Sequence, residues 1–226
     1  MPKIQPFERN VERYEEWFDR YPLAYRSELE AVRALLPKGG DGLEVGVGTG
    51  RFAVPLGVRE GIEPSGAMAR LAVERGVHVR SGTAEALPCK DGSFDYLLMV
   101  VTVCFLDDVY LAFREAHRVL RPGGQVLIGF IDRVSPLGRA YEKLRDANVF
   151  YRDATFFSTD EVVFHLSEAG FGEFVFRQTI FQHPGEMEKA DPVKPGYGEG
   201  SFVVVRGRRP TGLGTRGSNA GPGFPV

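Results

Sequence analysis

A glycine-rich segment gives the clearest chemical signal in the sequence. It reads EVGVGTG from Glu44 to Gly50, after a short apolar stretch, and includes Gly46 and Gly48. Glycines at every second position let the backbone turn sharply and approach a ligand with no side chain in between. The third glycine comes one residue too early for the dinucleotide fingerprint G-x-G-x-x-G. The segment therefore favours a ligand-binding turn between a strand and a helix over a bare connection, and it does not indicate a pyrophosphate.

An acidic residue ends the next apolar stretch, in the sequence Ile62-Glu63-Pro64. At that point of a doubly wound sheet, a carboxylate can accept hydrogen bonds from both hydroxyls of a ribose, and it repels a 2'-phosphate. The structural alternative is a solvated carboxylate near a helix N-terminus, where the helix dipole favours it. Together with the glycine-rich segment, Glu63 favours a ribose as part of the ligand.

A third segment, GTAEALP at 82–88, follows another short apolar stretch. The strand expected before it lies beside the strand that ends at Glu63, at the same edge of the sheet. An adenine can sit there once its ribose is held. The segment is therefore a candidate neighbour of an adenine.

Strands and helices alternate between residues 40 and 130, which predicts an α/β fold. Because strands that alternate with helices form right-handed crossovers, the sheet is expected to be mostly parallel and covered on both faces, as a three-layer sandwich. Apolar stretches bounded by turn residues indicate strands at 42–47, 58–62, 77–80, 96–101 and 125–130. Helical spacing and stop signals, among them RPGG at 121–124, indicate helices at 51–56, 65–75 and 108–120.

The N-terminal region is expected to be helical. Apolar residues recur at helical spacing from Phe7 to Tyr21, with charged residues between them. This amphipathic helix is expected to break near Pro22, and a second helix is expected at 24–36.

The second half of the chain has a less regular pattern. Residues 136–148 show helical spacing, and Ser158 with Glu161 has the form of a capping box before a helix. Two strand candidates, 174–181 and 202–206, have no helix between them, so they pair more easily as antiparallel neighbours.

These motifs resemble those of the class I S-adenosylmethionine-dependent methyltransferases, and more narrowly the small-molecule group named after ubiquinone and menaquinone biosynthesis. The resemblance covers 43–130 with specific motifs and 7–206 more loosely. It implies a Rossmann-like, seven-stranded sheet of order 3-2-1-4-5-7-6, with the seventh strand antiparallel. The motifs that carry it are EVGVGTG, Glu63, GTAEALP, SFDYLLMV and RVLRPGGQVLIGF.

The resemblance implies S-adenosylmethionine as the cofactor and S-adenosylhomocysteine as the product. The glycine-rich segment would surround the methionine part, Glu63 would hold the ribose, and Met68 would pack on the ribose or the adenine. Met99 would lie near the methionyl amino group through its backbone. The expected cofactor residues are Glu44, Gly46, Gly48, Gly50, Glu63, Pro64, Met68, Thr83, Ala84, Glu85 and Met99.

Two positions depart from the family's pattern. Thr83 stands where many members have an aspartate, so Glu85 or a backbone carbonyl is expected to contact the adenine amino group instead. Cys104 and Phe105 stand where members often have two histidines, so a histidine base is absent there. Well-oriented reactions gain about 7 to 11 kcal/mol from positioning alone. We therefore predict catalysis mainly by positioning and name no catalytic residue.

The expected acceptor is a small molecule that offers a nitrogen, oxygen, sulfur or carbon atom. Tyr14 and Trp17 are the candidate substrate residues on the N-terminal helix, because their polar tips suit a partly wet boundary; packing in the core is the alternative. Segments 133–157 and 192–200 are expected to build the substrate pocket, the latter with Tyr197. An amine, a phenol, a carboxylate and a quinone-like carbon acid all fit the sequence equally well.

Composition fits one globular domain in a reducing compartment. The 226 residues are 43% hydrophobic, and 28 Lys plus Arg against 30 Asp plus Glu give no electrostatic case for a nucleic acid or a membrane surface. The two cysteines and four histidines show no metal-ligand spacing, so no metal is expected, and a cytoplasmic setting fits best. A single domain at 1–206 is expected, with a helical lid at 7–36 and a disordered tail at 207–226.

Two other functions share these motifs. A nicotinamide-dependent oxidoreductase can be built on the same general sheet, although the early third glycine and GTAEALP argue against it. A non-catalytic protein that keeps the cofactor pocket would also match. Methylation of nucleic acid or protein is disfavoured by the net charge of -2 and by the lack of an added recognition domain. The sequence does not indicate the oligomeric state.

Overall fold

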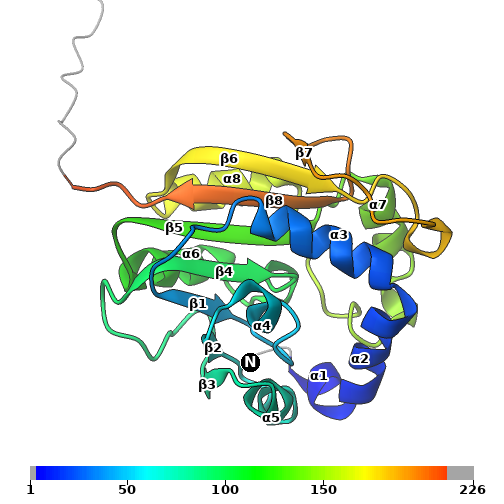
Figure 1. The fold of residues 1–226 in the computed structure, drawn as a ribbon, viewed down its shortest axis with the longest axis horizontal. Coiled ribbons are helices and arrows are strands. Elements are labelled where there is room, and N and C mark those ends of the chain that lie inside the picture. The colour runs from blue at the N-terminus through cyan, green and yellow to red at the C-terminus, as the bar shows by residue number, and fades with distance from the viewer. Residues whose placement is uncertain (1–3, 213–226) are drawn as a thin grey trace, which may run out of the picture.

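A computed structural model describes residues 4–212 of the chain (Figure 1). Its centre is one sheet with the strand order β3-β2-β1-β4-β5-β8-β6-β7. Strands β1 to β5 run parallel to one another, and β8 lies antiparallel between β5 and β6. The strands are β1 (Gly42–Val45), β2 (Glu60–Ile62), β3 (His78–Arg80), β4 (Phe94–Val100), β5 (Leu120–Ile131), β6 (Gly172–Thr179), β7 (Lys194–Pro195) and β8 (Phe202–Arg208).

Helices cover both faces of the sheet and confirm the three-layer sandwich. In β4, Leu97 and Met99 face a core that α6 and α8 share, whereas Leu98 and Val100 face a core that α3, α4 and α5 share. This alternation follows from the two-residue period of a strand. The helices are α1 (Gln5–Arg9), α2 (Val11–Arg20), α3 (Pro22–Arg33), α4 (Ala53–Leu56), α5 (Gly66–Glu74), α6 (Val109–Val119), α7 (Pro136–Lys143) and α8 (Thr159–Glu168).

The sheet has eight strands in the described residues, so the expected number of seven is wrong. The additional strand is β7, two residues that pair with Arg177 and Gln178 of β6. It lies in a Pro- and Gly-rich stretch, which sequence patterns predict as a loop. The other seven strands have the order that the resemblance implies, and the antiparallel pairing of β6 with β8 is confirmed.

The RPGG sequence is part of β5 and does not separate a helix from a strand. β5 begins at Leu120, which pairs with Phe94 of β4, and the register shifts before the next pair. Gly123 has a φ of +82°, and a Cβ atom on Gly124 would lie 2.8 Å from the carbonyl oxygen of Arg121. The two glycines therefore permit an irregular turn inside a continuous strand.

The N-terminal helix is broken twice, where the sequence predicts one break. α1 ends at Arg9 and α2 begins at Val11; the side chain of Asn10, between them, donates a hydrogen bond to the carbonyl of Pro6 at 2.8 Å. The expected break at Pro22 is confirmed, since α3 begins there.

The capping box at the start of α8 is confirmed. The Ser158 side chain accepts a hydrogen bond from the Glu161 backbone, and the Glu161 carboxylate accepts one from the Ser158 N–H at 2.7 Å.

The end of the described chain is more ordered than its composition indicates. Gly207 and Arg208 fall in the predicted tail but belong to β8, where Gly207 pairs with Val126. Arg209 donates a hydrogen bond to the Leu120 carbonyl at 2.5 Å. The rest of the predicted tail, from residue 213, lies outside the described residues.

Candidate active site

A large cavity in the described part of the chain lies at the carboxyl ends of the parallel strands. Figure 1 shows α1 and α2 beside these strand ends. The cavity has a volume of about 430 Å³ and is lined by the loop after β1, the residues that follow β2, β3 and β4, helices α1 to α3, and residues from 131 to 151. Ligands bind at this edge of doubly wound sheets.

Two glycines of the loop after β1 have conformations that glycine adopts most readily. Gly46 and Gly48 have φ angles of +70° and +56°. A Cβ atom on Gly46 would lie 2.5 Å from Cγ2 of Thr102, and one on Gly48 would lie 3.3 Å from the Tyr14 hydroxyl. The loop therefore presents bare backbone to the cavity.

Glu63 lies beside this loop and is 8% exposed. Its two carboxylate oxygens accept hydrogen bonds from the backbone N–H groups of Gly48 and Ser65, each at 2.9 Å. Burial raises the pKa of Glu63, and these two donors act in the opposite direction. A carboxylate oxygen can accept more than one hydrogen bond, so Glu63 keeps acceptor capacity for the hydroxyls of a ligand.

The structure brings most of the predicted cofactor residues together at one end of the cavity. The thioether of Met68, the side chain of Thr83 and exposed backbone lie there beside the carboxylate of Glu63. The predicted residues that line the cavity are Gly46, Gly48, Glu63, Pro64, Met68, Thr83, Ala84 and Glu85. The strand ends of β1, β2 and β3 place them, as the α/β topology requires.

Three predicted cofactor residues, Glu44, Gly50 and Met99, do not line the cavity. Burial, with the nearby charge of Glu63, raises the pKa of Glu44 well above its usual range, and its Oε2 has no hydrogen-bond partner among the described residues. A Cβ atom on Gly50 would contact Ala72 of α5. Met99 points into the core beneath α6, and the next two residues of the chain line the cavity instead.

Tyr14 and Trp17 both line the cavity, whereas Tyr197 does not. Tyr197 is 43% exposed, packs on Phe176, and donates a hydrogen bond to Asp160 at 3.0 Å. The pairing of β7 with β6 keeps its loop at the far edge of the sheet. The expectation that segment 192–200 helps to build the pocket is therefore wrong.

The segment after β5 does contribute to the cavity wall, as expected for 133–157. Tyr141 and Tyr151 stack with their ring centroids 5.0 Å apart, and Phe150 lies 5.3 Å from the ring of Phe7 in α1. Asn148 is the amide side chain on this wall. Rings from the N-terminal helices and from residues 141–151 thus line the same cavity.

Val101, immediately after β4, is a strained residue in the cavity wall that the sequence did not reveal. Its φ is +53°, which a β-branched residue rarely adopts. Its backbone N–H donates a hydrogen bond to the Gly129 carbonyl at 2.7 Å, which holds the strained conformation. Such strain gathers at ligand sites.

Glu28 is a second cavity residue that the sequence analysis missed. It lies on α3 and is 4% exposed. Ala24 and Val32, one turn before and after it, are fully buried. The sequence did contain a sign of this residue, because a glutamate in the middle of an apolar helix face indicates a buried acid.

One acidic side chain of α2 joins the N-terminal helices to the glycine-rich loop. The Glu15 carboxylate accepts hydrogen bonds from Thr49 at 2.5 Å, from Arg51 at 2.6 Å, and from Arg75. Although burial acts to raise the pKa of Glu15, these donors lower it to about 2. Glu15 is therefore ionised at neutral pH and holds α2 over the cavity.

Comparison with known proteins decides the family. A family model described as a methyltransferase domain matches residues 43–128. A protein from Thermotoga maritima, whose crystal structure is named as an SAM-dependent methyltransferase, is 54% identical, covers 91% of this chain and 99% of its own, and has a TM-score of 0.90. The chain belongs to the S-adenosylmethionine-dependent methyltransferases.

Other relatives of this methyltransferase are more distant. An uncharacterized protein from Methanocaldococcus jannaschii is 43% identical over 199 residues, 88% of this chain and 96% of that protein. A demethylmenaquinone methyltransferase from Roseiflexus castenholzii is 39% identical over 101 residues, which cover 40% of this chain and 42% of that enzyme. The likeness to the menaquinone group is thus limited to part of the chain.

The cofactor of this methyltransferase is S-adenosylmethionine, and the family supports an enzyme over the nicotinamide-dependent oxidoreductase and the non-catalytic binding protein. Within residues 4–212, no three His, Cys, Asp or Glu side chains gather as metal ligands. None of the helices in that range is both long enough and apolar enough to span a bilayer.

Proposed function

We propose that this methyltransferase acts on a small molecule that binds inside the aromatic cavity. The observation that supports this most strongly is the enclosure of the cavity by rings on opposite sides, Tyr14 and Trp17 from α2 and Tyr141 and Tyr151 from the segment after β5. Its volume of about 430 Å³ lies in the range of small-molecule sites, about 300 to 1,000 Å³.

The end of the cavity near β1 and β2 fits the cofactor. The bare backbone at Gly48 would take the methionine part, Glu63 would accept hydrogen bonds from the ribose hydroxyls, and Met68 would pack on the nucleoside. When bound, S-adenosylmethionine supplies a methyl group attached to a positively charged sulfur. Tyr14, directly above Gly48, is an aromatic ring suited to lie near such a cation.

Positioning is the catalytic device that we infer. None of the described cavity-lining residues is a histidine. Phe7 and Phe105 make an edge-to-face contact, with ring centroids 4.8 Å apart, at the wall of the cavity and help to exclude water. The N-terminal helices act as a lid that Glu15 anchors, and the lid holds the acceptor in place.

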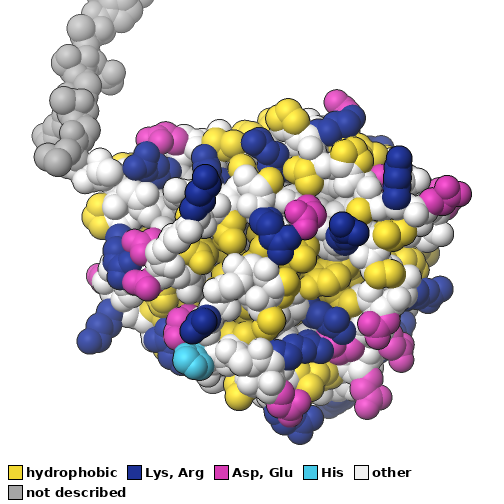
Figure 2. Space-filling view, viewed as in Figure 1, with side chains coloured by type: hydrophobic (Ala, Val, Ile, Leu, Met, Phe, Trp, Pro, Cys, Tyr) yellow, Lys and Arg dark blue, Asp and Glu magenta, His cyan; other side chains and the backbone are white. Residues whose placement is uncertain are grey.

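The charge distribution and one relative support a small acceptor. On the face shown in Figure 2, basic and acidic side chains are interspersed, so that face offers no track of one sign for a nucleic acid. The Thermotoga maritima relative is named as a possible histamine N-methyltransferase, and histamine is a small amine.

We place the reaction in the cytoplasm. The chain has two cysteines, Cys89 and Cys104, with no C-x-x-C spacing, and such sparse cysteine usage is usual in a reducing compartment.

Calorimetric titration with S-adenosylhomocysteine, followed by an acceptor screen, tests the proposal. We expect micromolar binding of S-adenosylhomocysteine, and a gain of one methyl group, detected by mass spectrometry, on small molecules. Methylation of RNA or of protein, with no small molecule accepted, would contradict the proposed acceptor class. No binding of S-adenosylhomocysteine would contradict the proposed cofactor site.

A further inference from the structure

Glu28 is a buried acid with no protein partner. It is 4% exposed and lines the cavity, no hydrogen bond or ion pair joins its carboxyl group to another side chain or to the backbone within residues 4–212, and burial alone shifts its pKa. Other acids of the site are satisfied by the protein: Glu63 by two backbone N–H groups and Glu15 by Thr49 and two arginines. A buried polar group without a partner costs free energy. A ligand in the cavity is the partner that the structure leaves for Glu28.

Glu28 lies in the half of the cavity opposite the cofactor end. α3, which contains it, packs on β5, β6 and β8, whereas Glu63 follows β2. β2 and β5 are three strand spacings apart in the sheet, roughly 14 Å. The charge of Glu28 acts to raise the pKa of Tyr141 and of Tyr151, and the charge of Glu63 acts to raise the pKa of Tyr14. The cavity therefore has a second polar group on the acceptor side.

The surroundings of Glu28 suit a cation more than any other ligand group. The charge of Glu28 acts on the phenols of Tyr141 and Tyr151, and burial raises the pKa of Glu28 to about 8. Aromatic faces attract ammonium groups, and a carboxylate adds a charged hydrogen-bond acceptor. An ammonium group can replace the carboxyl proton and pair with the resulting carboxylate, whereas a carboxylate or a quinone carbonyl can only accept one hydrogen bond from the neutral acid.

We propose that Glu28 recognises a protonated nitrogen of the methyl acceptor, which makes the substrate class an amine with an aromatic or apolar body. This inference rests on the proposed function, because it assigns the acceptor to the same cavity. On binding, the carboxyl group releases its proton to water and the ammonium group of the acceptor replaces that proton as an ion pair.

Binding of matched probes to the protein loaded with S-adenosylhomocysteine tests the inference. The probes are histamine, phenethylamine, its neutral isostere 2-phenylethanol and its acidic isostere 3-phenylpropionate. We expect at least one amine to bind, and phenethylamine to bind about 10- to 100-fold more tightly than 2-phenylethanol and more tightly than the acid. Calorimetry in two buffers of different ionisation enthalpy at pH 6.5 should detect about one proton released per amine bound.

Glu28→Gln is the variant that separates recognition from folding, and Glu30→Gln on the exposed face of the same helix is its control. Glu28→Gln should lose the preference for the amine and the proton release, while its affinity for S-adenosylhomocysteine and its melting cooperativity are unchanged. Glu30→Gln should behave as the wild type.

Three results would overturn the inference and leave the proposed function standing: no amine bound, equal affinity for amine and alcohol, or undiminished amine binding in Glu28→Gln. Failure of the wild-type protein to bind S-adenosylhomocysteine would instead count against the proposed function. The proton-release measurement needs no variant, so it tests the inference even if Glu28→Gln does not fold.

Discussion

At the scale of single residues, the hydrogen bond between the Gly48 N–H and the Glu63 carboxylate joins the two strongest motifs of the sequence. One comes from the loop after β1 and the other from the end of β2, strands that lie side by side. The bond orients Glu63 toward the cavity and fixes the loop against it. A change in either residue should therefore affect the cofactor more than the fold.

Gly48→Ala should weaken the binding of S-adenosylhomocysteine by at least about tenfold, or about 1.4 kcal/mol. The new methyl group would lie 3.3 Å from the Tyr14 hydroxyl and 3.5 Å from Cε of Met68, in the space where the ligand meets bare backbone. Gly57→Ala is the matched control, because Gly57 also has a positive φ, +74°, but has nothing within 4 Å of the added atom. Both variants should lose about 1 kcal/mol of stability, and only Gly48→Ala should lose affinity in calorimetry. Equal affinities would show that the ligand does not approach Gly48.

Glu63→Gln should reduce the affinity for S-adenosylhomocysteine by about 30- to 150-fold, which corresponds to about 2 to 3 kcal/mol. A glutamine has only one oxygen to offer, so it cannot accept hydrogen bonds from Gly48, Ser65 and a ribose together. Glu60→Gln, at the other end of β2, removes an exposed ion pair with Arg80 and should leave the affinity unchanged. Unaltered affinity in a folded Glu63→Gln protein would refute the ribose contact.

The sequence predicted that Gly48 and Glu63 lie at one site, because their positions depend on the backbone path, and both line the cavity. It could not locate Val101, because its left-handed conformation depends on the hydrogen bond to the Gly129 carbonyl of the neighbouring strand. Nor could it separate Tyr14, in the cavity wall, from Tyr197, because both have the same amphipathic side chain. Residue type indicates what a side chain can do, and tertiary packing decides where it does it.

At the scale of elements, α2 is held over the cavity by a few charged contacts of Glu15 with the loop after β1 and with α5. Aromatic contacts between α2 and its neighbours add to them. A lid of this kind can open without disturbing the sheet, because the charged groups that hold it lie at its edge.

Glu15→Gln should loosen α2. Because the pKa of Glu15 in the folded protein is about 2, its contribution is fully present at neutral pH and is lost as the pH falls from about 4.5 through about 2. At neutral pH we expect faster hydrogen exchange of the backbone amides in residues 11–20 and about fivefold weaker binding of S-adenosylhomocysteine, or about 1 kcal/mol.

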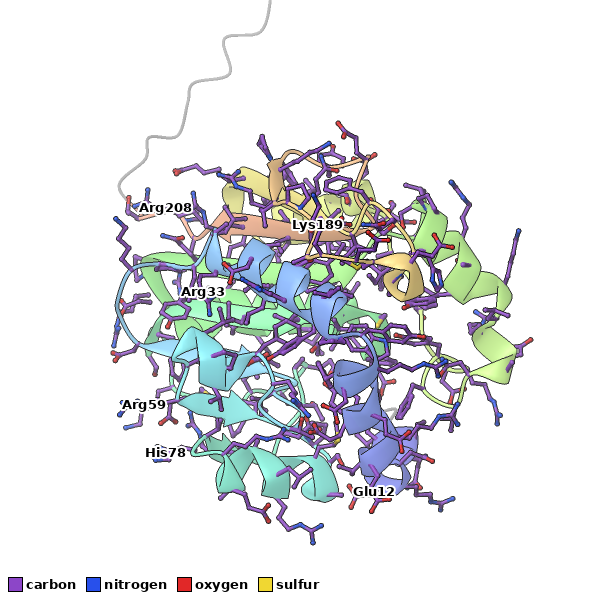
Figure 3. The ribbon with its side chains drawn as sticks, turned by 45° about the vertical axis from the view of Figure 1, so that its right-hand side comes forward. Glu12, Arg33, Arg59, His78, Lys189 and Arg208 are labelled. Atoms are coloured by element: carbon purple, nitrogen blue, oxygen red, sulfur yellow. The ribbon has the colours of Figure 1, made fainter. Side chains whose placement is uncertain are left out.

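The control for this variant is Glu12→Gln. Glu12 lies on the same helix, is labelled at the lower edge of Figure 3, and is exposed. It should leave both the hydrogen exchange and the affinity unchanged. Equal exchange rates in Glu15→Gln and the wild type would show that the charged contacts do not hold the lid.

The sequence predicted the elements whose ends depend on local residues, and it did not predict those whose extent depends on pairing with another strand. The capping box of Ser158 and the break at Pro22 are local chemistry, and both are confirmed. β7 exists because the backbone at Lys194 meets an unpaired edge of β6, and β5 continues through RPGG because β4 and β8 pair with it. Partners that are distant in the sequence determine these strands.

At the scale of the whole molecule, the proposed function divides the reaction between the two halves of the sheet. β1 to β3 position the predicted cofactor residues, whereas β5, β8 and the helices packed on them position Tyr141, Tyr151 and Glu28 in the cavity wall. In the half with β1 to β3, Glu63 accepts hydrogen bonds from two backbone N–H groups, and Glu44 is buried beneath the loop after β1. Glu28, in the other half, is left neutral and unpaired, which costs the empty protein stability at higher pH.

This cost should be measurable as a pH-dependent difference in stability between the wild type and Glu28→Gln. Glu28 has a pKa of about 8 in the folded protein and an ordinary value near 4.5 when unfolded. Between these values the unfolded chain binds fewer protons, so rising pH lowers the free energy of unfolding of the wild type by about 1.4 kcal/mol per pH unit from this group. Glu28→Gln lacks this contribution. Other acids with raised pKa values, Glu44 and Glu63, occur in both proteins and cancel in the difference.

The test is urea unfolding at pH 5, 6, 7 and 8. From pH 5 to pH 8, the free energy of unfolding of Glu28→Gln should rise relative to that of the wild type by about 3 to 4 kcal/mol in total, whereas the difference between Glu30→Gln and the wild type should stay constant. A constant difference for Glu28→Gln as well would mean that the carboxyl group titrates normally and is not held neutral in the cavity. Amine binding should reverse the trend, because the ion pair stabilises the charged form of Glu28 in the folded protein alone. If Glu28 serves recognition, Glu28→Gln should be more stable than the wild type and should bind the amine less tightly.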